Sequence, residues 1–494
     1  MRGIRHIAVL WIVLAVSAHA STGRAQEPLV ASDYEIDLVT TPVLGAGRIV
    51  GLGGAYTALA DGIDGAPWNP AAYGSRTLWE LDWFEWELTA GILFPGSFAD
   101  NDFFNSGSDS GFRFRNFVFL SFGFRLQFGD FGFGSLPRLQ LYELGDGAQR
   151  LSATFTVINY GLAYQLLDGQ LVIGAGLRYA ALSLARIETG ESLVDFSGTG
   201  PEMGLLLRLA GQPWRLGVAG RLPVRSNRIG GDNFFLDQAT GTGCVPASSG
   251  AMTCAGGIIL PSEVHMPWEV QVGVAWQIGR RPLNRAFEDP DDAERELGHA
   301  MTMRQWERER EQVGRELGGP PPPTDPHRWL PRRARDPEFW GREQTKREEE
   351  EELLDAQIEE AEAARDREVR ELSRLYLLIS ADLLITGPTD DGVGVEGFLA
   401  QERVESGRGT RLGARLGVEG EPWGNRLKLR AGTYLEPSRF SSAGYRLHAT
   451  GGFDLRLFTW NLFGLFDDFD VRAGVTVDWA PRYFDWGVGV GFWH

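Results

Sequence analysis

Polar and apolar residues alternate with a period of two along much of the chain after residue 76. In the segment RLKLRAGTYL (426–435), leucine, alanine and threonine lie on one face, and arginine, lysine and tyrosine lie on the other. The segments YRLHATGGFDLRLF (445–458) and FDVRAGVTVDW (469–479) repeat this alternation. A period of two predicts β-strands that have one apolar and one polar face.

The length of these segments favours strands that cross a membrane. Many run for about 10 to 14 residues, which is the length that a tilted membrane-spanning strand needs. Aromatic residues crowd several segment ends, as in WELDWFEW (79–86) and WGVGVGFWH (486–494), and such clusters suit the interfaces of a membrane. A soluble β-sandwich would alternate too, but it requires neither feature. Because no stretch after residue 25 approaches ~18 uninterrupted apolar residues, we predict an all-β fold, a closed antiparallel transmembrane β-barrel.

The pattern predicts about fourteen strands, an even number, as in single-chain bacterial barrels. The weakest is 129–143, because Pro137 interrupts it. The predicted spans are 77–94, 112–125, 129–143, 150–166, 170–187, 198–210, 213–225, 267–279, 373–386, 409–420, 425–436, 445–459, 468–479 and 483–493.

The links between the spans differ in length on the two sides of the predicted barrel. Links such as 166–170, 210–214 and 420–425 are short and fall on one side. Short periplasmic turns and long outer loops are typical of such barrels, so the short side is predicted to be periplasmic. The long links on the other side are 95–111, 226–266, 387–408 and 437–444.

Residues 281–372 break the alternation. They are strongly charged and carry about half of the net charge of −18, which disfavours nucleic-acid binding. Residues 289–317 and 343–372 are predicted to be helices, and the proline-rich segment 318–333 between them is predicted to be extended. By strand parity this insertion hangs on the periplasmic side. It is either a solvated, partly disordered helical arm or a docking arm for a periplasmic protein.

The start of the chain reads as a secretion signal over residues 1–25. Arg2 and Arg5 precede an apolar run, and small residues that suit cleavage follow it. An exported chain meets an oxidising space, so Cys244 and Cys254 are predicted to form a disulfide. Two free thiols or half of a metal site are the alternatives, but no cluster of histidine and cysteine accompanies the pair.

The segment VGLGGAYTALADGIDGAPWNPAAYG (50–74) lies between the signal and the first span. A fourteen-stranded barrel has a lumen that is wider than its wall side chains can fill. A compact segment ahead of the first strand can plug it. Its glycines allow tight turns and close backbone approach. AYTALAD (55–61) can form one or two helical turns, and Pro70 begins a further turn.

This segment resembles the N-terminal hatch of the FadL/TodX-type outer-membrane transporters of long-chain fatty acids and other hydrophobic compounds. In that family a GxGGA step, an AxAD step and an NPA step follow in order, and here they occupy residues 51–55, 58–61 and 69–71. The hairpin 159–179 also resembles the family, whereas the insertion departs from the family's short periplasmic turns. The candidate hatch residues are Gly51, Gly53, Gly54, Asp61, Asn69, Pro70 and Ala71.

The resemblance implies passive uptake across the outer membrane of a Gram-negative bacterium, with outer-membrane lipid around the barrel. A fatty acid or another hydrophobic small molecule would be caught among the outer loops and enter a lumenal pocket. It would leave when the hatch shifts or through a gap in the wall. The alternative is a FadL-like scaffold that binds a periplasmic or secretion partner through residues 281–372.

Cations on the predicted lumenal face add an argument from the residues themselves. A carboxylate needs a cationic partner where water is scarce. The same cations can instead pair with lumenal aspartates and simply pack the interior. The ligand-binding candidates are Arg411, Arg415, Lys428, Arg430, Arg446 and Arg456, and Arg178, Arg215 and Arg221 share the predicted lumenal face.

No motif for catalysis or cofactor binding is present. The GLGG step lacks the third glycine of a dinucleotide fingerprint, and there is no Walker, HExxH or GxSxG motif. We therefore expect no enzyme, no cofactor and no metal, and we expect His448 to be a hydrogen-bonded wall residue. The predicted division is 1–25 signal, 26–75 hatch, 76–280 strands one to eight, 281–372 insertion and 373–494 strands nine to fourteen.

Overall fold

The computed structural model describes most of the chain after the predicted signal. The predicted signal, the two cysteines Cys244 and Cys254 and the proline-rich segment 318–333 lie outside the described residues. The described residues are 27–95, 102–107, 115–144, 151–188, 190, 192–226, 245–246, 252–253, 259–285, 298–299, 303–304, 307–308, 310–311, 337–441, 443–460 and 469–492.

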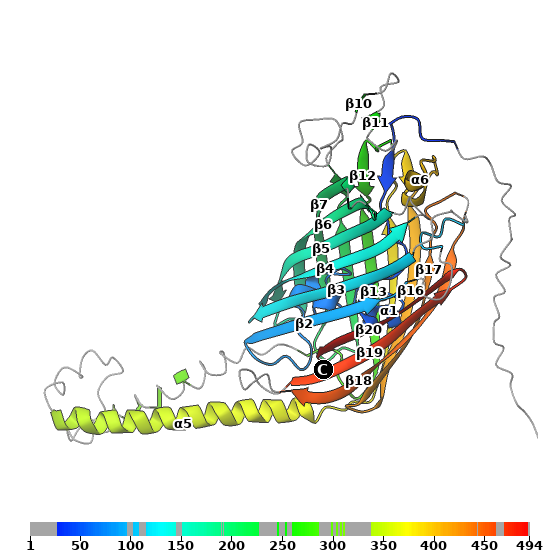
Figure 1. Cartoon of the computed structure of the whole chain (residues 1–494). Helices are drawn as coiled ribbons and strands as arrows, with labels where there is room; N and C mark the ends of the chain where they lie inside the picture. The colour runs from blue at the N-terminus through cyan, green and yellow to red at the C-terminus, as the bar shows by residue number, and fades with distance from the viewer. Residues whose placement is uncertain are drawn as a thin grey trace, which may run out of the picture.

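Fourteen antiparallel strands form a closed barrel (Figure 1). Each spanning strand pairs with the next one along the chain, and the last pairs with the first, with Val490 opposite Ala90. The predicted fold and strand number are confirmed. The strands are β2 (Phe84–Leu93), β3 (Arg115–Phe128), β4 (Phe131–Leu144), β5 (Leu151–Leu166), β6 (Leu171–Arg186), β7 (Ser192–Leu207), β8 (Trp214–Arg221), β13 (Glu269–Gly279), β14 (Tyr376–Thr386), β16 (Arg411–Trp423), β17 (Leu427–Glu436), β18 (Arg446–Trp460), β19 (Phe469–Ala480) and β20 (Tyr483–Phe492).

The two faces of the wall follow the alternation in the sequence. Leu429 and Leu447 point outward and are 47% and 62% exposed, whereas their neighbours Arg430 and His448 are buried in the lumen. An outer surface of this kind, with large apolar side chains on successive strands, is stable only when lipid surrounds it. The barrel is therefore a membrane-spanning one.

The span 129–143, which had the weakest strand pattern in the sequence, is a complete strand in the structure. β4 runs for 14 residues, and Pro137 lies opposite Ile158 of β5. On the β3 side the ladder pairs Ser121 with Arg138 and Phe124 with Ser135, and it has no pair at Pro137. Proline has no N–H to donate, so an interruption of the ladder on one side accommodates it.

The two ends of the barrel differ. The end with the links 129–130, 167–170, 208–213 and 424–426 is called the inner end, and the opposite one the outer end. The link 481–482 is short although it lies at the outer end. The remaining short elements are β1 (Glu35–Asp37), β9 (Val224–Ser226), β10 (Val245–Pro246), β11 (Met252–Thr253), β12 (Glu263–Met266), β15 (Gly392–Gly394) and α6 (Val395–Ala400).

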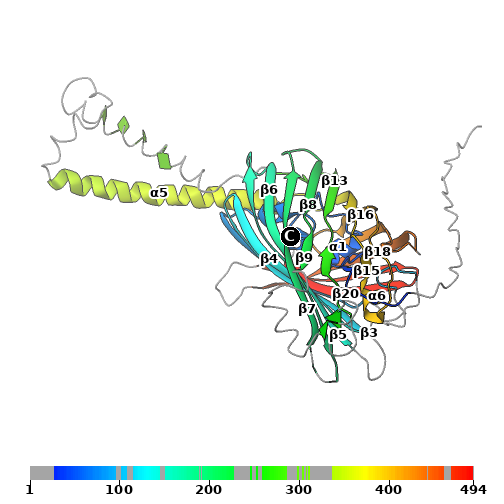
Figure 2. The same cartoon turned by 90° about the horizontal axis from the view of Figure 1, so that it is seen from above.

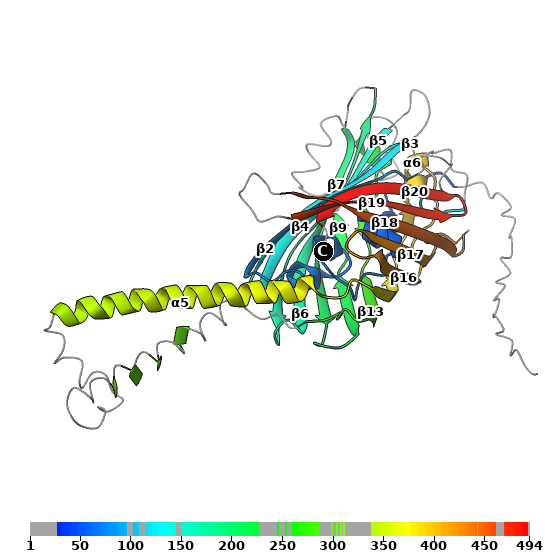
Figure 3. The same ribbon diagram turned by 90° about the horizontal axis from the view of Figure 1, so that it is seen from below.

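The charged insertion leaves the barrel at the inner end, between β13 and β14. Its helix α5 (Pro337–Arg370) has 34 residues and projects away from the barrel (Figure 1, Figure 3). At 1.5 Å per residue it is about 50 Å long. Of residues 289–317, eight are described and all eight are helical. No helix among the described residues is long and apolar enough to cross a membrane.

Residues 47–75, called the hatch, fill the lumen. α1 (Gly47–Gly51) lies inside the ring of strands (Figure 2), and η1 (Ile63–Gly65) and η2 (Pro70–Gly74) follow it. Residues 55–61 form a single turn, in which the Ala60 N–H donates to the Tyr56 carbonyl at 2.9 Å, the lower of the one or two turns that the sequence allows. Glycines with positive φ lie on both sides of this segment and stop a helix from propagating.

Candidate functional site

The hatch lies very close to the backbone of the barrel wall. The wall residues at these contacts are glycines. A Cβ atom on Gly204 of β7 would overlap the Asn69 side chain, and one on Gly174 of β6 would overlap the Pro70 carbonyl. Only glycine leaves room for such an approach. The eight wall residues that receive the hatch in this way are called the glycine belt: Gly132, Gly161, Gly174, Gly204, Gly217, Gly273, Gly417 and Gly432.

Asn69, in the predicted NPA step, ties the hatch to itself and to the wall. Its Oδ1 accepts a hydrogen bond from the Ala71 N–H at 3.0 Å and so caps η2. Its Nδ2 donates to the carbonyls of Thr57 (2.9 Å) and of Leu205 on β7 (3.0 Å). Pro70 occupies the first position of η2, where a missing N–H does no harm. The motif is therefore a structural anchor.

The glycines of the GxGGA step are required by conformation and by space. Gly53 has φ of +61°, and a Cβ there would lie 2.9 Å from the backbone nitrogen of Thr433 on β17. Gly54 has φ of +75° and would meet Arg415 at 3.2 Å. Gly51 packs against Arg430, which a Cβ would meet at 3.3 Å. This step lets the chain turn in contact with the wall.

Asp61, the last residue of the AxAD step, joins two arginines. Its carboxylate lies 2.6 Å from Arg215 of β8 and 3.3 Å from Arg48 of α1. Burial opposes the ionisation of Asp61, but the guanidinium groups of Arg215 and Arg48 outweigh it and hold its pKa below the usual value. Arg48 also holds Glu419 of β16 through two hydrogen bonds of 2.8 and 2.9 Å.

The ion pairs continue along the wall and return to the hatch. Arg430 of β17 contacts Glu419 at 2.6 Å and Asp454 of β18 at 2.7 Å. Arg472 of β19 contacts Asp454 at 3.0 Å and Asp64 of the hatch at 4.0 Å. We call this set the ion-pair chain: Arg215, Asp61, Arg48, Glu419, Arg430, Asp454, Arg472 and Asp64.

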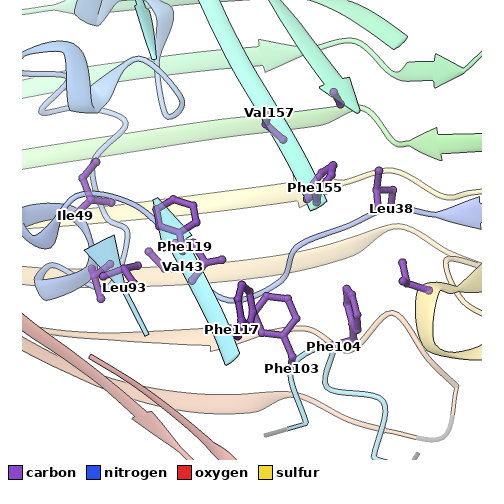
Figure 4. Packing of buried hydrophobic residues seen from close by; sticks show 14 of the residues in the cluster. Leu38, Val43, Ile49, Leu93, Phe103, Phe104, Phe117, Phe119, Phe155 and Val157 are labelled. Carbon is purple, nitrogen blue, oxygen red and sulfur yellow. The ribbon is translucent and has the colours of Figure 1, made fainter. Parts of the chain in front are cut away.

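A polar cavity borders the ion-pair chain on the inner side of the hatch. A second cavity lies on the outer side of the hatch. The second one, called the outer cavity, has an apolar wall that includes Val43, Phe119, Phe155 and Val157. These side chains gather near one another in Figure 4. The outer cavity therefore offers a water-poor surface to an apolar molecule.

Cations surround the outer cavity. Arg138 of β4, Arg178 of β6, Arg221 of β8 and Arg415 of β16 all line it, together with one carboxylate, that of Glu269. Glu269 lies 3.2 Å from the Arg178 guanidinium and 3.6 Å from that of Arg221. The Nε atoms of Arg138 and Arg178 are buried and have no hydrogen-bond acceptor. Arg221 also lies 3.6 Å from the buried carboxylate of Glu202. The four guanidinium groups outnumber the two carboxylates with which they form ion pairs, and the two Nε donors remain for an anionic group.

The six predicted ligand-binding candidates do not come together. Arg415 reaches the outer cavity, whereas Lys428 and Arg430 line the cavity at the inner end. Arg446 pairs with Glu436 at 2.6 Å, Arg456 pairs with Asp470 at 2.6 Å, and Arg411 lies at the outer end of β16.

Sequence reasoning missed Arg138 and Glu269. Arg138 follows Pro137, in the span that appeared weakest. Its alternation with Leu139, like that of Gln140 with Leu141, was the signal that could have placed it in the lumen.

His448 is a hydrogen-bonded wall residue, as expected. Its Nδ1 lies 2.8 Å from Asp478 of β19, and its Nε2 lies 2.8 Å from Glu436 of β17. The ring stacks on Tyr434 with 4.1 Å between the ring centroids. The Tyr434 hydroxyl in turn accepts a hydrogen bond from the Val43 N–H at 3.2 Å. These contacts pack the lumen beside the hatch.

A closed barrel with an apolar exterior defines a transmembrane β-barrel, and here a segment ahead of the first spanning strand is packed in its lumen. No family model and no curated protein matches the sequence. Among solved structures, the chain is similar to the Pseudomonas putida toluene transporter TodX (12% identity, TM-score 0.46, 92% of this chain and 99% of that chain). It is also similar to a Pseudomonas aeruginosa FadL homologue (11%, 0.44, 95% and 99%) and to the CymD monoaromatic hydrocarbon channel (10%, 0.43, 92% and 97%). The FadL and TodX type that the hatch motif led us to expect is among these structures.

Proposed function

We propose that the chain is an outer-membrane channel for the passive uptake of hydrophobic small molecules that carry an anionic head group, such as long-chain fatty acids. The observation that carries this proposal is the outer cavity, where an apolar wall adjoins four arginines and one carboxylate. In this orientation the inner end of the barrel faces the periplasm, and the long loops face the outside.

The two parts of such a molecule find different partners in the outer cavity. The chain of a fatty acid would lie against Phe119, Phe155 and Val157. Its carboxylate would take hydrogen bonds from arginine, because an anion away from water requires a charged or polar partner. The names of TodX and CymD refer to toluene and to monoaromatic hydrocarbons, which are neutral. A neutral hydrocarbon would use the apolar wall alone.

Replacement of Arg138 by methionine tests the role of the arginines. Loss of one charge-assisted hydrogen bond, worth about 1.5–3 kcal/mol, should lower the uptake of labelled oleate by roughly tenfold or more. Uptake is measured in a bacterial strain that lacks its own outer-membrane fatty-acid transporter. Arg456→Met is the matched control, because Arg456 pairs with Asp470 and does not line the outer cavity. Equal losses of oleate and toluene uptake in Arg138→Met would contradict a role in head-group binding.

A second candidate function is a scaffold that binds a periplasmic partner through residues 281–372. The observation that favours it is the projection of α5 from the inner end, where Leu353 is 57% exposed. Near the root of the helix, Val369 is buried and Glu368 lies 3.8 Å from Arg285. The rest of the described helix stands clear of the barrel (Figure 3), so its charged surface is open to a partner.

Deletion of residues 286–368 distinguishes the two functions. β13 and β14 pair over 11 residues, from Glu269 opposite Thr386 to Gly279 opposite Tyr376, so a short glycine-serine link should close the hairpin. We expect the shortened protein to insert and to take up oleate at a rate within about twofold of the full chain, because surface insertions contribute little to the stability of what they interrupt. Loss of uptake from a correctly inserted barrel would count against the channel as a self-sufficient unit. Loss of a co-purifying periplasmic protein would support the scaffold.

A further inference from the structure

The segment ahead of the hatch crosses the outer mouth of the lumen. Its strand β1 runs parallel to β12 on one side and to β15 on the other, so that Ile36 is opposite both Val264 and Val393. β12 and α6 lie at the end of the barrel opposite α5 (Figure 1). We call residues 27–46 the mouth strap. Ile36 and Tyr34 are fully buried in it, so these two side chains are packed into the mouth, whereas Val30 near the start of the strap is 68% exposed.

A buried ion pair fastens the mouth strap to the outer loops. The two oxygens of Asp37 accept hydrogen bonds from Arg439 at 2.8 and 2.9 Å, which is a bidentate geometry. The hydroxyls of Thr389 and Ser406 each donate to Asp37 at 2.7 Å. The side chains of Asp37 and Arg439 are 1% and 3% exposed. This group of four residues is called the strap latch.

The mouth strap also forms part of the wall of the outer cavity. Val39, Thr40, Pro42, Val43 and Leu44 all line that cavity. Thr40 accepts a hydrogen bond from Gln140 of β4 at 3.3 Å. A movement of the strap would therefore change both the mouth and the cavity beneath it.

The strap pairs with its neighbouring strands over a short length. β1 pairs over three residues with β12 and over three with β15. Toward its start, the strap is joined to the loops by single backbone hydrogen bonds, such as that from the Leu29 N–H to the Gln401 carbonyl at 2.8 Å. The hatch, by contrast, is received by the glycine belt on eight strands. The β ladder of the strap is therefore short, and its buried ion pair is the strap latch. The hatch is in close contact with eight strands of the wall.

We propose that the mouth strap is the entry gate of the channel. A molecule from outside reaches the outer cavity when β1 separates from its neighbours and the strap latch opens, while the hatch stays in place. This inference rests on the proposed transport function and adds the element that controls access to the outer cavity.

A reversible tether tests the gate. Residues opposite one another in neighbouring strands point to the same face, so Ile36→Cys and Val264→Cys place two thiols within reach of a disulfide. The pair is built in a Cys244→Ser, Cys254→Ser background, and mass spectrometry verifies the bond. In the oxidised protein, oleate uptake should fall by about tenfold or more, because the open state is no longer populated, and reduction should restore it.

A matched tether in the wall serves as the control. Leu429→Cys and Phe453→Cys form a pair between β17 and β18 that lies outside the mouth, and both native side chains face lipid. Its oxidation should leave uptake unchanged. A verified 36–264 bond that leaves uptake at the wild-type rate would overturn the gate.

Two further measurements separate the gate from the proposed function and from a misfolded variant. Thr389→Ala with Ser406→Ala removes two donors of the strap latch and should speed the initial uptake of oleate. In Val43→Cys, a membrane-impermeant maleimide should label the outer cavity of intact cells more slowly when the strap is tethered. Equal labelling with and without the tether counts against the gate even in a protein that transports nothing. If the untethered protein takes up neither oleate nor toluene, the proposed function fails independently of the labelling result.

Discussion

Replacement of Gly204 by valine should prevent the hatch from docking and should make the outer membrane leaky. The new side chain would occupy the space of the Asn69 amide and of the Pro70 ring. Asn69 is fully buried and makes hydrogen bonds to Ala71, Thr57 and Leu205, so it cannot move aside without losing them. Each lost hydrogen bond is worth about 1 kcal/mol, and the overlap itself costs about 1–3 kcal/mol. The sum places the substitution among the most damaging in the protein.

The measurement is the sensitivity of cells to an antibiotic that is too large for general porins. Cells that express Gly204→Val should become sensitive, while a heat-modifiable band on a gel shows that the barrel itself is formed. Gly220→Val is the matched control in the neighbouring strand β8, because the nearest atom to a Cβ there is 4.0 Å away. Resistance equal to that of the wild type in Gly204→Val would mean that the glycine belt does not seal the lumen.

Replacement of Glu419 by glutamine should release the hatch on its other side. Glu419 is shared by Arg48 of the hatch and Arg430 of β17, and its side chain is 2% exposed. The change removes the common anion of Arg430, which is buried, and of Arg48, which is 22% exposed. Removal of one partner of a buried ion pair typically destabilises a protein by about 3–5 kcal/mol. We therefore expect increased sensitivity to the same antibiotic and a lower free energy of unfolding in detergent.

The control for this substitution is Glu405→Gln. Glu405 pairs with Arg408 at 2.8 Å, but both side chains are largely exposed, and such surface pairs contribute about 0–1 kcal/mol. It should behave as the wild type. An unchanged free energy of unfolding in Glu419→Gln would show that the ion-pair chain packs the lumen without holding the hatch.

The two substitutions probe two different ways of holding one plug. On the strands of the glycine belt, the hatch is held by close backbone packing, which leaves no room for a ligand to pass. It is also held by side chains that carry charge. Arg48 contacts Glu419 on β16, and Asp64 contacts Arg472 on β19. An effect of Gly204→Val that exceeds the effect of Glu419→Gln would identify backbone packing as the stronger of the two.

The alternation predicted the number of spanning strands, but some of their limits only approximately. The first and sixth spans were predicted to begin at residues 77 and 198, whereas β2 begins at Phe84 and β7 at Ser192. Each strand carries its own signal, because lipid on one side and the lumen on the other impose a period of two on every span independently of its partners. The turn predicted at Pro70 is present, because η2 begins there and Asn69 caps it locally. The contact of Asn69 with Leu205 of β7 was not predicted, because it depends on how the hatch packs in the lumen. Pro137 made the span 129–143 look weak, but the span was still predicted correctly because the residues around Pro137 alternate.

Which cations share a cavity could not be predicted from the sequence. Arg138, Arg178, Arg221 and Arg415 come from four different strands, and the stagger of those strands in the closed barrel brings them to one level. Arg430, on an equally polar face, lies instead in the ion-pair chain. The parallel pairing of β1 at the mouth could not be predicted either, because a strand of three residues is too short to show an alternation of polar and apolar residues. The alternation predicts whether a side chain points to the lumen or to the lipid. Its level along the barrel axis depends instead on the register of the paired strands, which the alternation does not show.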